Sequence, residues 1–132
     1  MAKDTIGVIN EDEVKLKGLQ EMLQRQRVAE RERLKQEKAE YEKTNSQIKS
    51  LISSLIECEN NLLQTYEKIS LGISCGDSTV TSGIENIKNY KDKLTNNRII
   101  LQEVSREIDT EISKLNDQIN TLNSQIYWGW SV

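Results

Sequence analysis

Apolar residues recur every three or four positions along most of this chain, which is the spacing of one face of an α-helix. The pattern is clearest in the second half, where Lys91, Arg98 and Ser105 are its only interruptions. We call such a line of residues a seam, and expect its most closely packed part near the C-terminus. Its apolar members are Ile84, Ile87, Leu94, Leu101, Ile108, Ile112, Leu115, Ile119, Leu122 and Ile126.

The first half carries a matching seam from residue 41 onward. Its spacing assigns Tyr41, Ile48, Leu51, Leu55, Cys58, Leu62 and Ile69 to one face. Four neighbouring residues widen this face: Ile52, Ile56, Leu63 and Tyr66. A stripe this wide suits a helix bundle, or a helix that contacts more than one other helix.

Residues 11–40 divide into an apolar cluster and a polar stretch. The cluster consists of Leu16, Leu19, Met22 and Leu23, and residues 24–40 are mostly charged or amidic. Two interpretations of the polar stretch stay open. It is either a solvated helix with ion pairs at helical spacing or a charged docking surface.

Local signals predict where the helices begin and end. Asn10 with Glu13, and Ser82 with Glu85, form capping boxes that place helix starts near residues 11 and 83. Gly72 suits the position just past a helix end. The sequence therefore predicts one domain over residues 1–132, with a helix at about 11–70, a loop at about 71–82, a helix at about 83–127 and an aromatic tail at 127–132.

Two helices joined by a short loop most simply fold back on each other. We expect an all-α, antiparallel two-helix hairpin with long coiled-coil-like helices, completed by the helices of a partner. With the loop as the fixed end, the second helix covers roughly residues 25–70 of the first. The cluster at Leu16–Leu23 then projects beyond it, near the tail.

Composition excludes several functional classes. The net charge is −3, and the pI of about 5.1 argues against a nucleic-acid partner. The sequence contains no run of the ~20 apolar residues that span a bilayer, and its first residues lack the apolar region of a signal peptide. We expect a cytoplasmic protein, with export alongside a partner by a leaderless route left open.

The residues offer little for catalysis, so we expect a protein that is not an enzyme and has no metal or other cofactor. Histidine is absent, which removes the most common general base and metal ligand. Cys58 is expected to be a small buried thiol in the seam, and Cys75 falls in the loop. Two cysteines do not make a disulfide framework.

The C-terminus places both tryptophans within three residues, at Trp128 and Trp130. Trp is a preferred anchor in interfaces, and a thin two-helix core favours a partner chain. We therefore predict another helical protein as the partner, with self-association as a second option. The predicted partner-binding residues are Leu16, Leu19, Met22, Leu23, Ile52, Ile56, Leu63, Tyr127, Trp128 and Trp130.

A small helical hairpin without His or Pro, with Trp128-Gly129-Trp130, is similar to accessory proteins of type VII secretion, in particular the YwqH-like helical partners of LXG toxins. Cys58 in the first seam, the loop at 72–83 and the closing run ISKLNDQINTLNSQI at 112–126 carry the resemblance. In WXG-type proteins the Trp-x-Gly motif lies in the turn between the helices, whereas here it is C-terminal. The resemblance implies a targeting factor or chaperone rather than a secreted substrate.

Two functional hypotheses follow. In the first, the chain is a non-enzymatic adaptor or chaperone that binds the N-terminal helical domain of an LXG toxin, with room for a second small helical protein, and helps to target the toxin for export. In the second, the chain is a homo-oligomeric coiled-coil scaffold. The first rests on the uneven helices, the apolar end and the resemblance, and the second on the Ile/Leu heptads alone.

Overall fold

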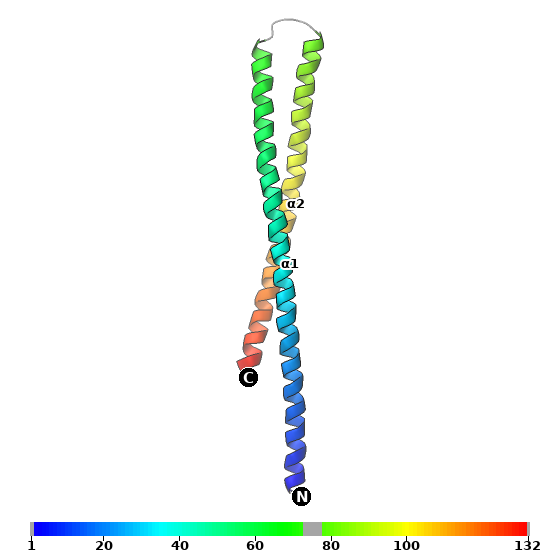
Figure 1. Cartoon of the computed structure of the whole chain (residues 1–132), viewed down its shortest axis with the longest axis vertical. Helices are drawn as coiled ribbons and strands as arrows, with labels where there is room; N and C mark the ends of the chain where they lie inside the picture. Colours follow the sequence, from blue (N-terminus) through cyan, green and yellow to red (C-terminus); the bar gives the residue numbers. More distant parts are fainter. Residues whose placement is uncertain (1, 73–77, 132) are drawn as a thin grey trace. The chain divides into compact units, whose positions relative to one another are not determined.

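The computed structural model describes residues 2–72 and 78–131, with side chains described over residues 11–70 and 80–128. Two helices make up these residues: α1 spans Ala2–Gly72 and α2 spans Ser78–Ser131. The second helix runs back along the first in the opposite direction (Figure 1). The predicted all-α antiparallel hairpin is confirmed. α1 is also continuous through the polar stretch at residues 24–40.

Both helices extend past the boundaries that the capping signals predict. α1 begins at Ala2 rather than near residue 11, and α2 begins at Ser78 rather than near residue 83. A capping box favours a helix start at its own position but does not force one, because Asn, Ser and Glu are also tolerated inside a helix. No proline precedes these residues, so nothing stops the helix from beginning earlier. α2 also continues to Ser131, so Tyr127 and Trp128 belong to the helix instead of a tail. Cys75 lies outside the described residues.

The chain divides into two units, each of which pairs one stretch of α1 with one stretch of α2. Unit 1 combines Met1–Glu40 with Ile112–Val132, and unit 2 is Tyr41–Glu111.

Unit 1 holds the most deeply buried apolar side chains. Leu34 of α1 and Leu115, Ile119 and Ile126 of α2 are all buried, with 5–8% of each residue exposed. The three α2 residues are the C-terminal part of its predicted seam, so the expectation that this part is the tightest is confirmed. Ion pairs at helical spacing join Arg33 to Glu30 and Glu37 on the surface of the same unit.

Unit 2 has a more polar seam than the sequence predicts. The apolar residues Tyr41, Ile48, Leu55, Leu62 and Ile69 of α1 are half-buried, as are Ile84, Ile87, Leu94, Leu101 and Ile108 of α2. The buried residues of this unit are polar: Asn45, Glu59 and Ser105.

Leu51 and Cys58 do not belong to the seam of unit 2, contrary to the prediction. Both are exposed, and the positions that follow them, Ile52 and Glu59, face α2 instead. An alternating step of four and three residues from Ile48 leads to 52, 55, 59 and 62, which is the spacing of a coiled-coil seam. Choosing apolar residues alone selects Cys58 over Glu59 and is wrong by one position.

Candidate protein-binding surface

An ion pair lies inside the seam of unit 2. Arg98 Nε of α2 donates a hydrogen bond to Glu59 Oε2 of α1 at 2.6 Å. The Thr95 hydroxyl donates to the other carboxylate oxygen, Oε1. A carboxylate at a buried position needs such partners, because burying a charge without them is costly. Arg98, which interrupts the α2 seam, therefore matches a charge on the facing helix.

These contacts lower the pKa of Glu59 below its ordinary value of 4.5. The hydrogen bond from Arg98 is the largest cause, with additional lowering from the Thr95 hydroxyl and from the positive charges of Arg98 and Lys91. Burial acts in the opposite direction and raises the pKa. The carboxyl group is therefore held in its charged form.

A second polar layer joins the helices of unit 2. Ser105 Oγ donates to Asn45 Oδ1 at 2.6 Å, and Asn45 Nδ2 donates to Asp109 Oδ1 at 2.7 Å. Lys49 Nζ lies 3.9 Å from the same Asp109 oxygen. Polar layers within a seam favour one alignment of the helices over a slipped one, because only the matched alignment satisfies them.

A shallow open groove of about 360 Å³ lies beside the ion pair in unit 2. Its apolar wall is formed by Ile56 and Leu63 of α1, whose exposed fractions are 40% and 39%. Its polar lining comes from Glu59, Asn60, Lys91, Thr95 and Arg98. An apolar patch bordered by polar groups matches the usual composition of a protein interface, which has an apolar centre and a polar rim.

The predicted partner-binding residues fall into two groups. Ile52, Ile56 and Leu63 lie in unit 2, and Ile52 is half-buried in the seam. The remaining ones lie in unit 1, where the described members are all exposed: Leu16, Leu19, Met22, Leu23, Tyr127 and Trp128. The side chain of Trp130 lies outside the described residues.

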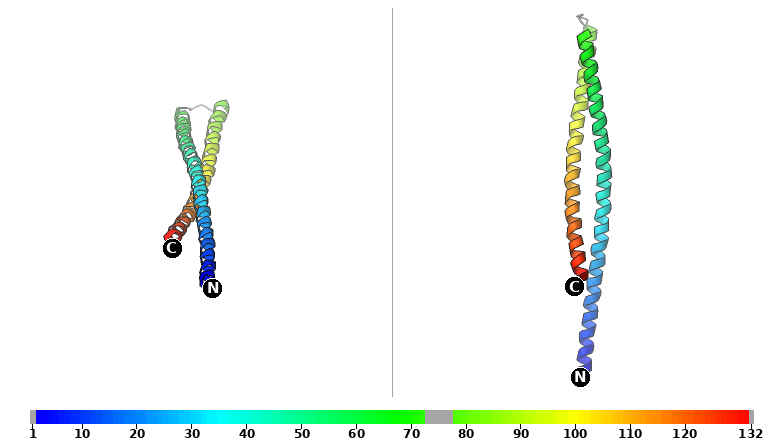
Figure 2. Two further views of the ribbon diagram at one scale, coloured as in Figure 1. Left: turned by 60° about the horizontal axis from the view of Figure 1, so that its bottom comes forward. Right: turned by 90° about the vertical axis from the view of Figure 1, so that its left-hand side faces the viewer.

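In unit 1, α1 continues beyond the end of α2 (Figure 2). Gln24 Nε2 donates to the carbonyl oxygen of Gln125 at 3.5 Å, close to the end of α2 at Ser131. Every side chain from residue 11 to residue 23 is exposed. The apolar cluster at Leu16–Leu23 is thus uncovered within unit 1.

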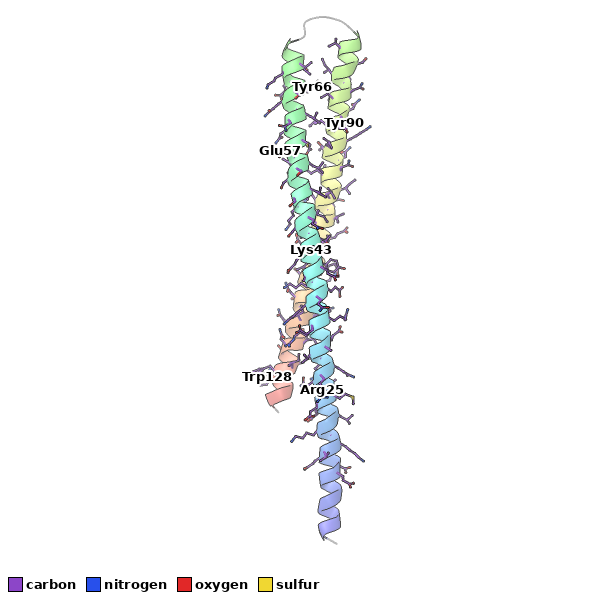
Figure 3. All side chains as sticks on the ribbon, in the orientation of Figure 1. Arg25, Lys43, Glu57, Tyr66, Tyr90 and Trp128 are labelled. Atoms are coloured by element: carbon purple, nitrogen blue, oxygen red, sulfur yellow. The ribbon has the colours of Figure 1, made fainter. Side chains whose placement is uncertain are left out.

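Two aromatic side chains occupy the end of α2 in unit 1. Tyr127 and Trp128 pack edge to face, with ring centroids 5.5 Å apart and an interplanar angle of 81°. About two thirds of each residue is exposed, and Trp128 is labelled near the end of α2 in Figure 3. In unit 2, Tyr90 is also exposed, whereas Tyr66 is half-buried.

Unit 1 has a second groove, of about 440 Å³, along the polar stretch of α1. It is lined by the polar residues Glu30, Arg33, Asp117, Gln118 and Thr121 and by the apolar residues Leu34 and Leu122. Arg31 crosses to α2, where Nη1 donates to Asn123 Oδ1 at 3.1 Å. Part of the polar stretch therefore contacts α2 directly, in addition to carrying surface ion pairs.

Sequence reasoning missed Asn45 and Glu59, which lie in the seam and, in the case of Glu59, line the groove. A signal for both was present. Lys91, Arg98 and Ser105 occur at seam positions of α2, so the facing helix had to supply polar partners. No group of three acidic or cysteine side chains suited to a metal ion occurs among the described residues. In those same residues, neither helix has a segment apolar and long enough to cross a membrane.

Comparison with known proteins returns no match. No protein-family model, no curated protein and no solved structure matches this chain.

Proposed function

We propose that this chain is a non-enzymatic helical adaptor that binds a helix of another protein. The observation that carries the proposal is the groove of unit 2, where Ile56 and Leu63 are exposed beside a fixed ion pair. Ile56 and Leu63 are two turns apart on one face of α1, so an amphipathic partner helix can lay its own apolar face along them. A partner helix that covers these residues removes them from water, which favours binding.

The partner that the family resemblance implies is the N-terminal helical domain of an LXG toxin, and the role it implies is that of a chaperone for type VII secretion. Exposed Tyr127 and Trp128 support a binding role, since large aromatic side chains anchor many interfaces. A chaperone of this kind keeps apolar helices of the toxin covered until export.

The test is titration of the purified chain with the purified N-terminal helical domain of an LXG toxin. Ile56→Asp with Leu63→Asp is expected to weaken the complex at least about tenfold, because it puts charges where apolar contacts form. Ile100→Asp is the matched control, since Ile100 is exposed on α2 of the same unit but does not line the groove. It should bind like the wild type.

Trp128→Ala provides a second arm of the same titration. A loss of affinity would assign the aromatic end of α2 to the same interface, and unchanged affinity would confine the interface to the groove. Absence of any complex with the wild-type chain would contradict the proposed toxin partner.

A further inference from the structure

The two units differ in the kind of side chain that each one buries. Among the residues whose side chains the structure describes, the buried apolar ones all belong to unit 1: Leu34, Leu115, Ile119 and Ile126. In the same part of the chain, the buried residues of unit 2 are all polar: Asn45, Glu59 and Ser105. Removal of apolar surface from water is the main force that pairs helices. The two units therefore differ in what holds their helices together.

The apolar residues in the seam of unit 2 stabilise it less than those of unit 1. Ile48, Leu55 and Leu101 are examples, and each of them is only half-buried. The stabilisation that an apolar side chain provides grows with the area that it removes from water. A half-buried side chain therefore contributes less to the pairing of α1 with α2 than a buried one does.

The polar contacts of unit 2 add little to this pairing. Arg98 donates to Glu59, and Ser105 donates to Asn45. A neutral hydrogen bond of this kind has a small net effect on stability, because water binds the same groups when the helices are apart. A buried ion pair also adds little, since removing its charges from water opposes their attraction. These contacts select the alignment in which the helices meet.

We propose that unit 2 opens and closes as one body, with its stretches of α1 and α2 separating while the helices of unit 1 stay paired. Opening exposes the half-buried apolar residues of both stretches to water. Each stretch is then a single helix, which is only marginally stable, so its backbone amides lose their protection. The two polar layers return the helices to the same alignment when unit 2 closes.

Opening also takes the groove of unit 2 apart, because its lining comes from both helices. Ile56 and Leu63 belong to α1, and the facing side is supplied by α2 through Lys91, Thr95 and Arg98. A partner helix in this groove binds only the closed state and shifts the equilibrium toward it. This coupling rests on the proposed function, whereas the opening itself is a property of the chain alone.

Hydrogen–deuterium exchange of the full-length chain, without any partner, tests the opening. The compared amides are those of residues 45–66 and 91–108 in unit 2 and of residues 24–38 and 112–126 in unit 1. After correction for intrinsic exchange rates, the amides of unit 2 should exchange about tenfold or more faster than those of unit 1. Equal protection of the two sets of amides would overturn the proposal.

Ile119→Val tests whether the two units open separately. Ile119 is buried in unit 1, with 7% of the residue exposed, and loss of one methylene group should speed exchange in unit 1 by roughly two- to tenfold. Exchange in unit 2 should stay within about twofold of the wild type. An equal increase in both units would mean that the hairpin opens all at once, which would overturn the proposal.

Asn45→Leu with Ser105→Ala tests whether a polar layer keeps unit 2 easy to open. The leucine fills the space of the amide with an apolar group, and the alanine removes the hydroxyl group that would lose its acceptor. Exchange in unit 2 should slow about tenfold or more, because a polar residue in a seam sets the alignment at a cost in stability. An unchanged rate in unit 2 would contradict the role of this layer.

The same measurements separate this inference from the proposed function. A chain that opens at unit 2 but binds no LXG helical domain would support the opening and contradict only the proposed partner. A chain that binds the domain but shows equal protection in both units would contradict only the opening. Where both hold, adding the domain should slow exchange in unit 2 and leave the order of the variants unchanged.

Discussion

Arg98 Nε and Glu59 Oε2 lie 2.6 Å apart across the seam of unit 2, where only 8% of the Glu59 side chain is exposed. Removing one member of such a pair leaves a charge without its partner at a buried position. Arg98→Leu is therefore expected to lower the free energy of unfolding by about 2 kcal/mol. Urea denaturation at fixed protein concentration measures this loss.

The double variant Glu59→Leu with Arg98→Leu checks the cause of that loss. Replacing a buried ion pair by apolar residues is often neutral or stabilising. The double variant should come within about 1 kcal/mol of the wild type or exceed it. A double variant as unstable as Arg98→Leu would show that the lost packing of Arg98, rather than the stranded charge, accounts for the effect.

The lowered pKa of Glu59 makes stability depend on pH. A carboxyl group whose folded-state pKa lies below its unfolded value of 4.5 contributes its full stabilisation above that pH. The contribution is lost as pH falls through the lower folded-state pKa. Thermal melts between about pH 6 and about pH 3 should show a smaller drop in Tm for Glu59→Gln than for the wild type. An equal drop in Tm for the two proteins would contradict the role of Glu59 in this pH dependence.

Asn45 is the centre of the second polar layer, with bonds to Ser105 and Asp109. Asn45→Ala removes both bonds and leaves Ser105 buried without this acceptor, which should cost about 1–2 kcal/mol. Ser53→Ala is the control, because Ser53 bonds only to the Lys49 carbonyl on the exposed face. Its expected cost is below about 0.5 kcal/mol. Equal costs for both would argue against a special role for the buried layer.

Gly18 lies in an exposed part of α1, and nothing lies within 4 Å of a Cβ built there. Gly18→Ala should therefore stabilise the helix by about 0.5–1 kcal/mol without a clash. A thermal melt followed by circular dichroism would detect the gain, because the helical signal would be lost at a higher temperature. A destabilised variant would mean that another chain approaches α1 closely at this position.

The seam of α2 could be predicted in full from its spacing, because Ile and Leu occupy most of its positions. The seam of α1 could be predicted at its apolar positions, Tyr41, Ile48, Leu55, Leu62 and Ile69, with Ile52 and Tyr66 expected beside them. The intervening positions include Asn45 and Glu59, which are buried only because α2 supplies Ser105, Asp109, Thr95 and Arg98. That pairing depends on how the helices align, which the pattern of one helix does not reveal.

The helix ends were less predictable for a related reason. Asn10 and Ser82 carry the sequence signature of a cap, yet α1 and α2 both begin earlier. A cap signature stabilises a helix start but does not prevent the helix from extending where no proline blocks it. The exposure of Leu16, Leu19, Met22 and Leu23, by contrast, follows directly from the greater length of α1 that the sequence predicts.

The central claim, that the groove of unit 2 receives a helix of another protein, is tested most directly by hydrogen–deuterium exchange. The full-length chain would be compared alone and with the LXG helical domain. Covering the groove should slow exchange of backbone amides around Ile56 and Leu63 of α1 and around Thr95 of α2, because a docked helix suppresses local opening. Unchanged exchange there, under conditions in which the complex forms, would contradict the account.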